Sequence, residues 1–136
     1  MKHNIGIIGY GGMAGWHHKN SSRVNNLECV AAYDIDPERL KAAKEKGLKA
    51  FSSLDKFFSE GCFDIVLVAT PNNFHREYAI RAMNEGKHVV CEKPVAMSTI
   101  ELQDMINASL RNKVLFTVHQ NRRWDKDFKI ISKVLG

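Results

Sequence analysis

The fold of this chain is decided near its N-terminus by residues 4–15, which read Asn4-Ile5-Gly6-Ile7-Ile8-Gly9-Tyr10-Gly11-Gly12-Met13-Ala14-Gly15. The isoleucines predict a short buried strand. Gly9, Gly11 and Ala14 then fit the pattern G-x-G-x-x-[G/A], which carries a strand into a helix in dinucleotide-binding folds. A glycine-rich turn can also serve only as a turn, so the prediction depends on a second signal.

Each position of this turn has a physical role in holding a diphosphate. Gly9 permits a tight turn, Gly11 leaves the main chain bare for the phosphates, and Ala14 lets the helix pack close to the strand. The helix N-terminus adds free N–H groups and the positive end of its dipole. The whole turn is therefore the predicted phosphate site, which comprises Gly9, Tyr10, Gly11, Gly12, Met13 and Ala14.

The second signal is Asp34, which ends an apolar run that begins at Cys29 and predicts a second strand. A carboxylate about 20 residues after the glycines can accept hydrogen bonds from an adenosine ribose. It also repels a 2′-phosphate, which favours NAD over NADP. The alternative role, a helix cap, is better filled by Asp36 with Pro37 at the first helical position.

The composition limits the classes of protein that this chain can belong to. Its 136 residues suffice for one domain with a real core, and 44% of them are apolar and 26% charged. No apolar run reaches the roughly 20 residues of a membrane span. The N-terminus enters a strand directly, which predicts a cytoplasmic protein without a signal peptide. The net charge of +5 is compatible with an anionic ligand but is more typical of a solvated surface.

Three cysteines, Cys29, Cys62 and Cys91, stand far apart in apolar surroundings. Their odd number and spacing predict buried reduced thiols and neither disulfides nor a zinc site. His17 and His18 lie on the predicted first helix as a partly exposed pair. No third ligand at metal spacing is visible, so no metal site is expected.

Strand-like and helix-like segments alternate along the chain, which predicts an α/β fold with a doubly wound parallel sheet, a three-layer Rossmann fold. Further strands are expected at 63–69, 88–91 and 114–118, and helices at 13–24, 37–46, 52–60, 75–85 and from 98. Gly47, Gly61 and Gly86 are expected to end helices in the left-handed conformation. Residues 1–124 form the predicted domain. Residues 125–136 form a terminal amphipathic helix that we expect to pack, with a solvated lysine face.

Polar residues follow two of the expected strands at the edge where open α/β sheets bind ligands. Thr70 and Asn72 place small hydrogen-bonding groups there, although Thr-Pro-Asn-Asn is also a good turn in any protein. Glu92-Lys93-Pro94 brings a carboxylate and an ammonium to the same edge. A lysine in a shaped pocket can trade protons near neutrality; an ordinary surface pair explains the residues equally well.

With these motifs in place, the chain resembles the N-terminal domain of the Gfo/Idh/MocA oxidoreductases, which include glucose-fructose oxidoreductase and inositol dehydrogenase. The resemblance runs nearly end to end. It rests on the glycine turn with His17, Asp34, Ala69-Thr70-Pro71-Asn72 with His75, Glu92-Lys93-Pro94, and Asn121-Arg122-Arg123.

The resemblance implies roles for several of these residues. Lys93 would contact the nicotinamide ribose and the substrate hydroxyl and assist proton transfer, and Glu92 would help to fix the nicotinamide side. Arg122 or Arg123 would lie near the cofactor. The remaining cofactor contacts implied are Thr70, Pro71, Asn72, His75 and Asn121.

Family members also carry a second α/β domain that supplies most substrate contacts, and this chain stops at Gly136, about where that domain should begin. The expected function is therefore the cofactor domain of an NAD-dependent dehydrogenase acting on a sugar, inositol or related polyol. The domain alone should bind NAD without turnover, and the longer enzyme is expected to be a homo-oligomer. The alternatives are an NADP-dependent reductase of the same superfamily and a non-catalytic dinucleotide sensor. A nucleic-acid module is disfavoured because no aromatic platform accompanies the basic residues.

Overall fold

A computed structural model describes the whole chain, residues 1–136. Its centre is a six-stranded sheet in the order β3-β2-β1-β4-β5-β6, in which every neighbouring pair is parallel. The strands are β1 (His3–Ile8), β2 (Leu27–Tyr33), β3 (Lys49–Phe51), β4 (Ile65–Val68), β5 (His88–Cys91) and β6 (Phe116–Val118). The order reverses between β1 and β4, which confirms the predicted doubly wound Rossmann fold. Strand β3 was not predicted, because three residues give too short an apolar pattern.

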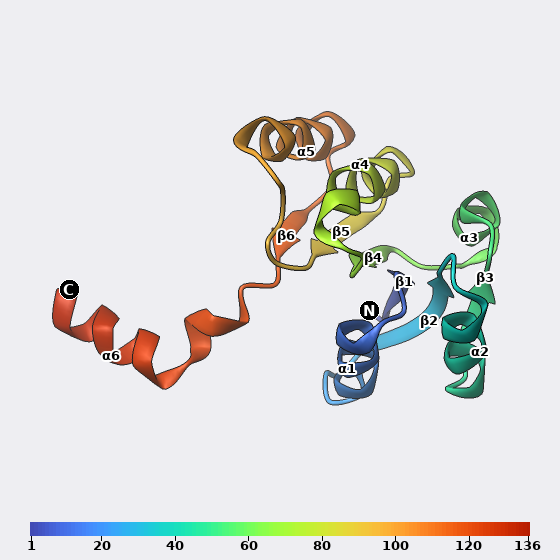
Figure 1. Cartoon of the computed structure of the whole chain (residues 1–136), viewed down its shortest axis with the longest axis horizontal. Helices are drawn as coiled ribbons and strands as arrows, with labels where there is room; N and C mark the ends of the chain where they lie inside the picture. Colours follow the sequence, from blue (N-terminus) through green and yellow to red (C-terminus); the bar gives the residue numbers. More distant parts are fainter.

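Helices connect the strands and cover both faces of the sheet (Figure 1). They are α1 (Gly12–Ser21), α2 (Pro37–Glu45), α3 (Leu54–Glu60), α4 (His75–Asn84), α5 (Thr99–Asn112) and α6 (Lys126–Leu135), with 3-10 turns η1 (Asn72–Phe74) and η2 (Asn121–Trp124). None of these helices combines the length and the apolarity that crossing a membrane requires.

The central strands β1 and β4 are buried on both faces, as their nearly continuous apolar sequences predict. On one face Ile7 of β1 and Leu67 of β4 pack with Ala14 of α1 and Ala43 of α2. The opposite face belongs to α3, α4 and α5, and its core contains the next residue of β1, Ile8. Alternate side chains of one strand therefore serve two cores, and the strand ends converge at a single carboxyl edge.

Glycines end two of the three helices in the way the sequence predicts. Gly47 and Gly86 have φ of +88° and +72°. Gly61 is different: its φ is −78°, so the predicted left-handed terminator is wrong here. A Cβ at Gly61 would lie 2.1 Å from Cε1 of Phe63, so this glycine is required for space rather than for its φ.

The cysteine after Gly61 takes the left-handed conformation instead, with φ of +55° at Cys62. Its side chain is exposed, whereas Cys29 and Cys91 are buried. The prediction of three buried thiols is therefore wrong for Cys62, because the turn between α3 and β4 places it at the surface.

The terminal helix α6 forms as predicted but does not pack as predicted. It has no buried residue, and Phe128, Ile131 and Leu135 are 49%, 55% and 83% exposed. Figure 1 shows the helix projecting away from the sheet, joined to it through η2. The helix lies away from both cores, so the expectation of a packed helix was wrong for this structure.

Candidate functional site

The glycine turn begins where β1 ends at the carboxyl edge of the sheet. Gly9 has φ of +88°, and a Cβ there would lie 2.9 Å from the main-chain oxygen of Ala69. Its N–H donates to the carbonyl of Tyr33, 2.9 Å away. The turn is thus clamped between β2 and β4, and only glycine suits this position.

The N-terminus of α1 is open to a ligand. Gly11 is its N-cap, no side chain caps the helix, and its first turn has no acidic residue. A Cβ on Gly12 would meet nothing within 4 Å. The free N–H groups and the positive dipole end suit a diphosphate. Ala14 is fully buried, which confirms the predicted close packing of α1 on the sheet.

Asp34 lies beside this turn as a buried carboxylate, 4% exposed. Its Oδ2 accepts the N–H of Tyr10 at 2.7 Å, and its Oδ1 accepts the N–H of Asp36 at 2.9 Å. The Nη1 of Arg39 lies 3.7 Å from Oδ2. Asp36 caps α2 through the N–H of Glu38, as predicted, so Asp34 itself is not the cap.

A groove of about 470 Å³ opens between Asp34 and the loop after β4. Its lining residues are Gly9, Tyr33, Asp34, Ile35, Asp36, Arg39, Thr70, Pro71, Phe74 and Tyr78. Burial, helped by the hydrogen bond and the charge of Tyr33, raises the pKa of Tyr78 to about 12, so this wall carries no phenolate at neutral pH. A groove that combines apolar side chains with the buried carboxylate of Asp34 suits an adenosine.

The loop after β4 brings Thr70 and Pro71 to this groove, while Asn72 opens η1 at the surface. His75 has a different place from the one expected. It is fully buried, and its ring nitrogens each lie 2.9 Å from a main-chain oxygen, those of Thr70 and Pro94. The expected direct cofactor contact of His75 is therefore wrong, because its ring ties two loops together and has no surface to offer a ligand.

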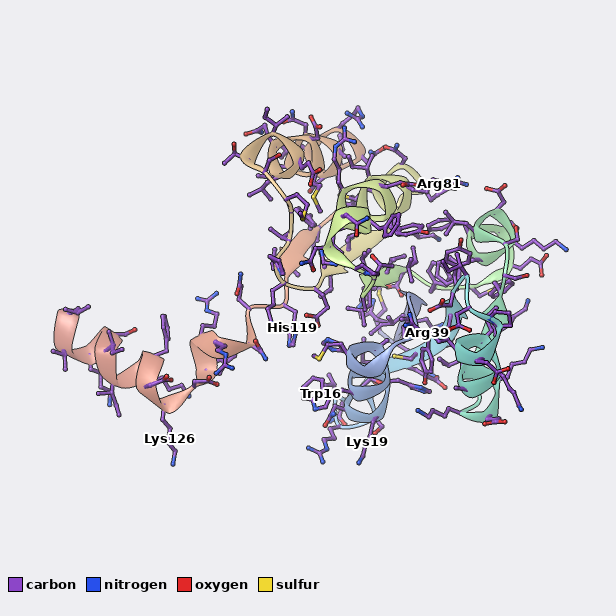
Figure 2. All side chains as sticks on the ribbon, viewed as in Figure 1. Trp16, Lys19, Arg39, Arg81, His119 and Lys126 are labelled. Atoms are coloured by element: carbon purple, nitrogen blue, oxygen red, sulfur yellow. The ribbon has the colours of Figure 1, made fainter.

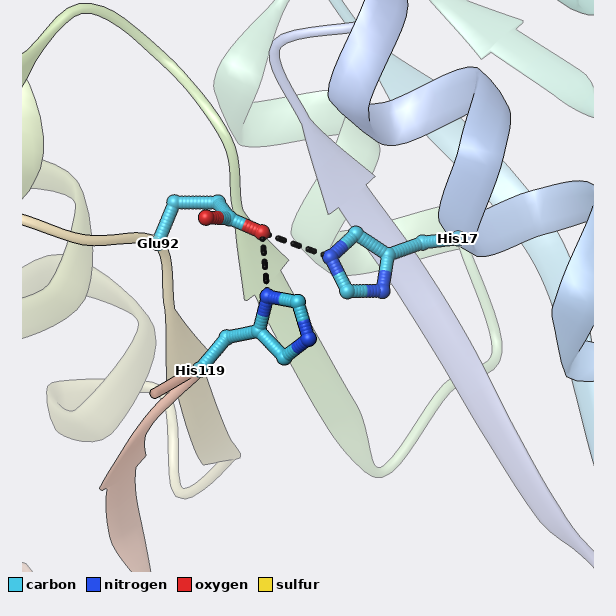
Figure 3. Close-up of side chains that lie close together, drawn as sticks. All are labelled: His17, Glu92 and His119. Carbon is cyan, nitrogen blue, oxygen red and sulfur yellow. Dashed lines mark hydrogen bonds and ion pairs between the residues drawn. The ribbon is translucent and has the colours of Figure 1, made fainter. Parts of the chain in front are cut away.

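The second half of the site lies where β5 and β6 end, around Glu92. This carboxylate is 5% exposed. Its Oε1 accepts from Nε2 of His17 at 2.6 Å and from Nδ1 of His119 at 2.9 Å (Figure 3). Its Oε2 accepts the N–H of Lys93 at 3.2 Å. Burial alone would raise the pKa of Glu92, but the hydrogen bond from His17, the charge of His119 and the Lys93 N–H together hold it below its usual value.

Lys93 itself is exposed at this edge and takes part in no ion pair, so its ammonium is free to meet a ligand. The residues of η2, which come after His119, are exposed. Arg122 is 84% exposed and pairs with Asp125 at 3.2 Å. Asn121 lines a separate hollow of about 420 Å³ with Trp16 and His119. Figure 2 shows Trp16 and His119 close together, and Lys126 of α6 well away from them.

Sequence reasoning missed three residues of this edge: Arg39, Tyr78 and His119. An arginine in the first turn after Asp34 is a visible signal for Arg39, since that turn faces the strand end. His119 follows a predicted strand directly, and the rule that strand ends meet at one edge could have placed it near Glu92. Nothing in the local pattern indicates Tyr78, which reaches the groove from α4.

The sequence of the chain also matches a known protein family. A family model described as an oxidoreductase family with an NAD-binding Rossmann fold, Gfo/Idh/MocA, matches residues 3–120. The chain belongs to the Gfo/Idh/MocA family. It is thus an NAD(P)-binding domain of these oxidoreductases, whose curated relatives include inositol and sugar dehydrogenases.

Individual Gfo/Idh/MocA relatives agree in sequence and in structure. The scyllo-inositol 2-dehydrogenase (NADP(+)) IolU of Bacillus subtilis is 35% identical over 131 residues, 95% of this chain and 40% of the relative. An NAD-binding protein from Listeria innocua superposes with a TM-score of 0.93 at 44% identity, over 99% of this chain and 40% of the other.

A third relative was solved with ligands. The WlbA dehydrogenase from Bordetella pertussis, in complex with NADH and UDP-GlcNAcA, superposes with a TM-score of 0.91 at 32% identity, over 99% of this chain and 42% of the other. The chain thus spans about 40% of the length of the relatives it matches.

Proposed function

We propose that this chain is the cofactor domain of an NAD-dependent dehydrogenase that acts on the CH–OH group of a sugar, inositol or related polyol. One observation carries the proposal: an uncapped helix N-terminus and a buried carboxylate, Asp34, flank the same glycine turn. The diphosphate would rest on the N–H groups of α1, and the adenosine would enter the groove beside Asp34. Residues 1–124 would form this domain, and residues 125–136 would lead to a substrate domain.

In this proposal the second half of the edge performs the chemistry. A dinucleotide held there would supply a nicotinamide ring as the acceptor for the hydride of the carbinol carbon. Lys93 would be the catalytic residue that assists the transfer of the hydroxyl proton, since its amino group is exposed where β5 ends. Glu92 would fix the position of Lys93, because its Oε2 accepts the Lys93 N–H and its Oε1 is anchored by two histidines.

The domain alone should bind NAD but turn over little, because without a substrate domain the reacting carbon is not positioned. Isothermal titration of the purified chain should give saturable NAD binding. Absorbance of NADH should stay flat with myo-inositol, scyllo-inositol or glucose as the test polyol. Steady NADH production would refute the expected inactivity, and the absence of NAD and NADP binding would refute the proposed function.

Use of NADP is the second candidate, and Arg39 favours it. Its guanidinium lies 3.7 Å from Asp34 and would lie 3.9 Å from a Cβ on Gly11, so a cation borders the ribose end of the groove. An arginine there accommodates a 2′-phosphate, whereas the carboxylate repels one. The scyllo-inositol relative is named as an NADP(+) enzyme.

Dissociation constants of NAD and NADP in three proteins decide between these candidates. If Asp34 dominates, wild type prefers NAD, Asp34→Ala loses that preference, and Arg39→Ala leaves it intact. If wild type binds both cofactors equally well and Arg39→Ala loses affinity for NADP alone, the result would favour NADP as the cofactor.

A dinucleotide sensor would not need Lys93, whereas the proposed dehydrogenase would. A Lys93 variant therefore distinguishes the two functions. Lys93→Ala should weaken NAD binding and leave ADP-ribose binding unchanged, because ADP-ribose lacks the nicotinamide end. Lys126→Ala is the matched control, since Lys126 lies on α6 away from the site (Figure 2). Unchanged NAD affinity in Lys93→Ala would favour the sensor.

A further inference from the structure

Three metal-ligand side chains from three separate elements meet at the end of β5. His17 comes from the middle of α1, Glu92 follows β5, and His119 follows β6. Their ligand atoms all lie within 4.8 Å of one another, and the two imidazole rings meet edge to face with centroids 4.5 Å apart (Figure 3). We propose that His17, Glu92 and His119 form a binding site for a divalent transition-metal cation, with Zn²⁺ as its best occupant.

The chemistry of the donor set supports this assignment. Two imidazoles and one carboxylate are a ligand set of zinc and related first-row metals, whereas Mg²⁺ and Ca²⁺ prefer oxygen ligands alone. Three protein ligands leave a fourth position of a tetrahedral ion for water. The site is therefore selective by ligand type, and it leaves one position open.

The geometry lies close to what an ion requires. Bonds of about 2.0–2.1 Å in a tetrahedral site hold donor atoms roughly 3.3 Å apart. Here Oε1 of Glu92 lies 2.6 Å from His17 and 2.9 Å from His119, so these two pairs need to open by less than about 1 Å. The two ring nitrogens lie within 4.8 Å of each other and need to close toward the same separation. The other carboxylate oxygen stays on the N–H of Lys93, which keeps the group oriented.

An ion must also displace the ring protons of the two histidines and reach the cluster from solvent. Each imidazole now donates a ring N–H to Glu92. An ion would bind those same nitrogens, so each ring must release that proton or carry it on the opposite nitrogen. The side chains of His17 and His119 are 17% and 22% exposed, and His119 lines the hollow that it shares with Trp16. The cluster is thus partly open to solvent, and the hollow borders it through His119.

Titration of Zn²⁺, Co²⁺ and Mg²⁺ into chelator-treated protein tests the site without any dinucleotide, so the result is independent of the proposed function. The chain should bind one Zn²⁺, Co²⁺ less tightly, and Mg²⁺ not at all. All proteins carry Cys62→Ser, because Cys62 is an exposed thiol that could bind zinc elsewhere. Absence of saturable Zn²⁺ binding below the millimolar range would overturn the proposal.

The decisive variant is His17→Gln with His119→Asn. Its amide N–H groups can replace the ring donors to Glu92, Gln for Nε2 and Asn for Nδ1, but amides are poor zinc ligands. Zn²⁺ affinity should fall at least about a hundredfold, while the melting temperature without metal stays near wild type. His3→Gln is the control, since His3 also pairs with a carboxylate, Asp64, but without a third ligand.

Zinc K-edge absorption of the wild-type complex keeps the test open if the double variant folds poorly. The spectrum should show two imidazoles with oxygen ligands and no sulfur. A shell of sulfur or of oxygen alone would overturn the proposal, as would a well-folded double variant that binds Zn²⁺ like wild type.

Discussion

Two buried carboxylates stand at the carboxyl edge of the sheet, and the fold holds them by different means. Asp34 accepts two main-chain N–H groups, those of Tyr10 and Asp36. Glu92 accepts two imidazole N–H groups, from residues 75 and 27 positions away in the chain. Main-chain donors come with the turn itself, whereas side-chain donors depend on where distant elements end. The first arrangement follows from the turns after two paired strands, β1 and β2, although Tyr10 is 24 residues from Asp34; the second brings together α1, the end of β5 and the end of β6.

The largest effect is expected from Gly9→Val, which breaks the turn that supports Asp34. A side chain at φ of +88° is strained, and its Cβ would lie 2.9 Å from the carbonyl oxygen of Ala69. We expect a loss of about 3 kcal/mol or more in the free energy of unfolding, measured by urea denaturation. Gly12→Ala is the control: its Cβ meets nothing within 4 Å, so its stability should stay within about 1 kcal/mol of wild type. Equal stability of Gly9→Val and wild type would contradict the assigned strain.

The next effect is that of Asp34→Ala, which leaves the Tyr10 and Asp36 amides without their acceptor. Such unpaired buried donors should lower the free energy of unfolding by about 2–3 kcal/mol. Asp34→Asn keeps an acceptor oxygen and should lose less. If both variants unfold at the same urea concentration as wild type, the two hydrogen bonds do not hold this end of the edge.

The contrast between the two carboxylates also explains what the sequence could predict. The glycine turn, Asp34 and the capping of α2 by Asp36 were all predicted, because each belongs to a pattern with a fixed spacing in the chain. The partners of Glu92 were not, since no local pattern says that His17 on the first helix and His119 after the last strand approach one carboxylate. The prediction for His75 was wrong for the same reason, because the burial of its ring depends on two loops that meet in space. The packing of α6 could not be judged from its pattern, which shows an apolar face but not what covers it.

Around Glu92, the expected effect is smaller and strongly coupled. Glu92→Ala should lower the free energy of unfolding by about 2 kcal/mol in the presence of a chelator, because two partly buried imidazoles lose their acceptor. His17→Ala with His119→Ala removes both ring donors and should destabilise wild type, but it should have almost no further effect on stability in the Glu92→Ala background. This mutant cycle is measured by urea denaturation. Additive effects on the free energy of unfolding would show that other contacts hold the histidines.

The smallest effect belongs to a third carboxylate, Asp64, which is 44% exposed at the other end of β4 and serves as the reference for the two buried ones. Its partial burial raises its pKa, but the hydrogen bonds from His3 and from the N–H of Asn4 outweigh this and hold the pKa below its usual value. A lowered pKa in the folded state stabilises the fold above the unfolded value of about 3.9, and this contribution is lost as the pH falls through the folded value. Asp64→Asn should therefore reduce the free energy of unfolding at neutral pH by less than about 1 kcal/mol, since solvent screens an exposed pair. The variant and wild type should converge as the pH falls through the lowered folded-state pKa of Asp64; a difference that persists in strong acid would mean that Asp64 acts through packing and not through its charge.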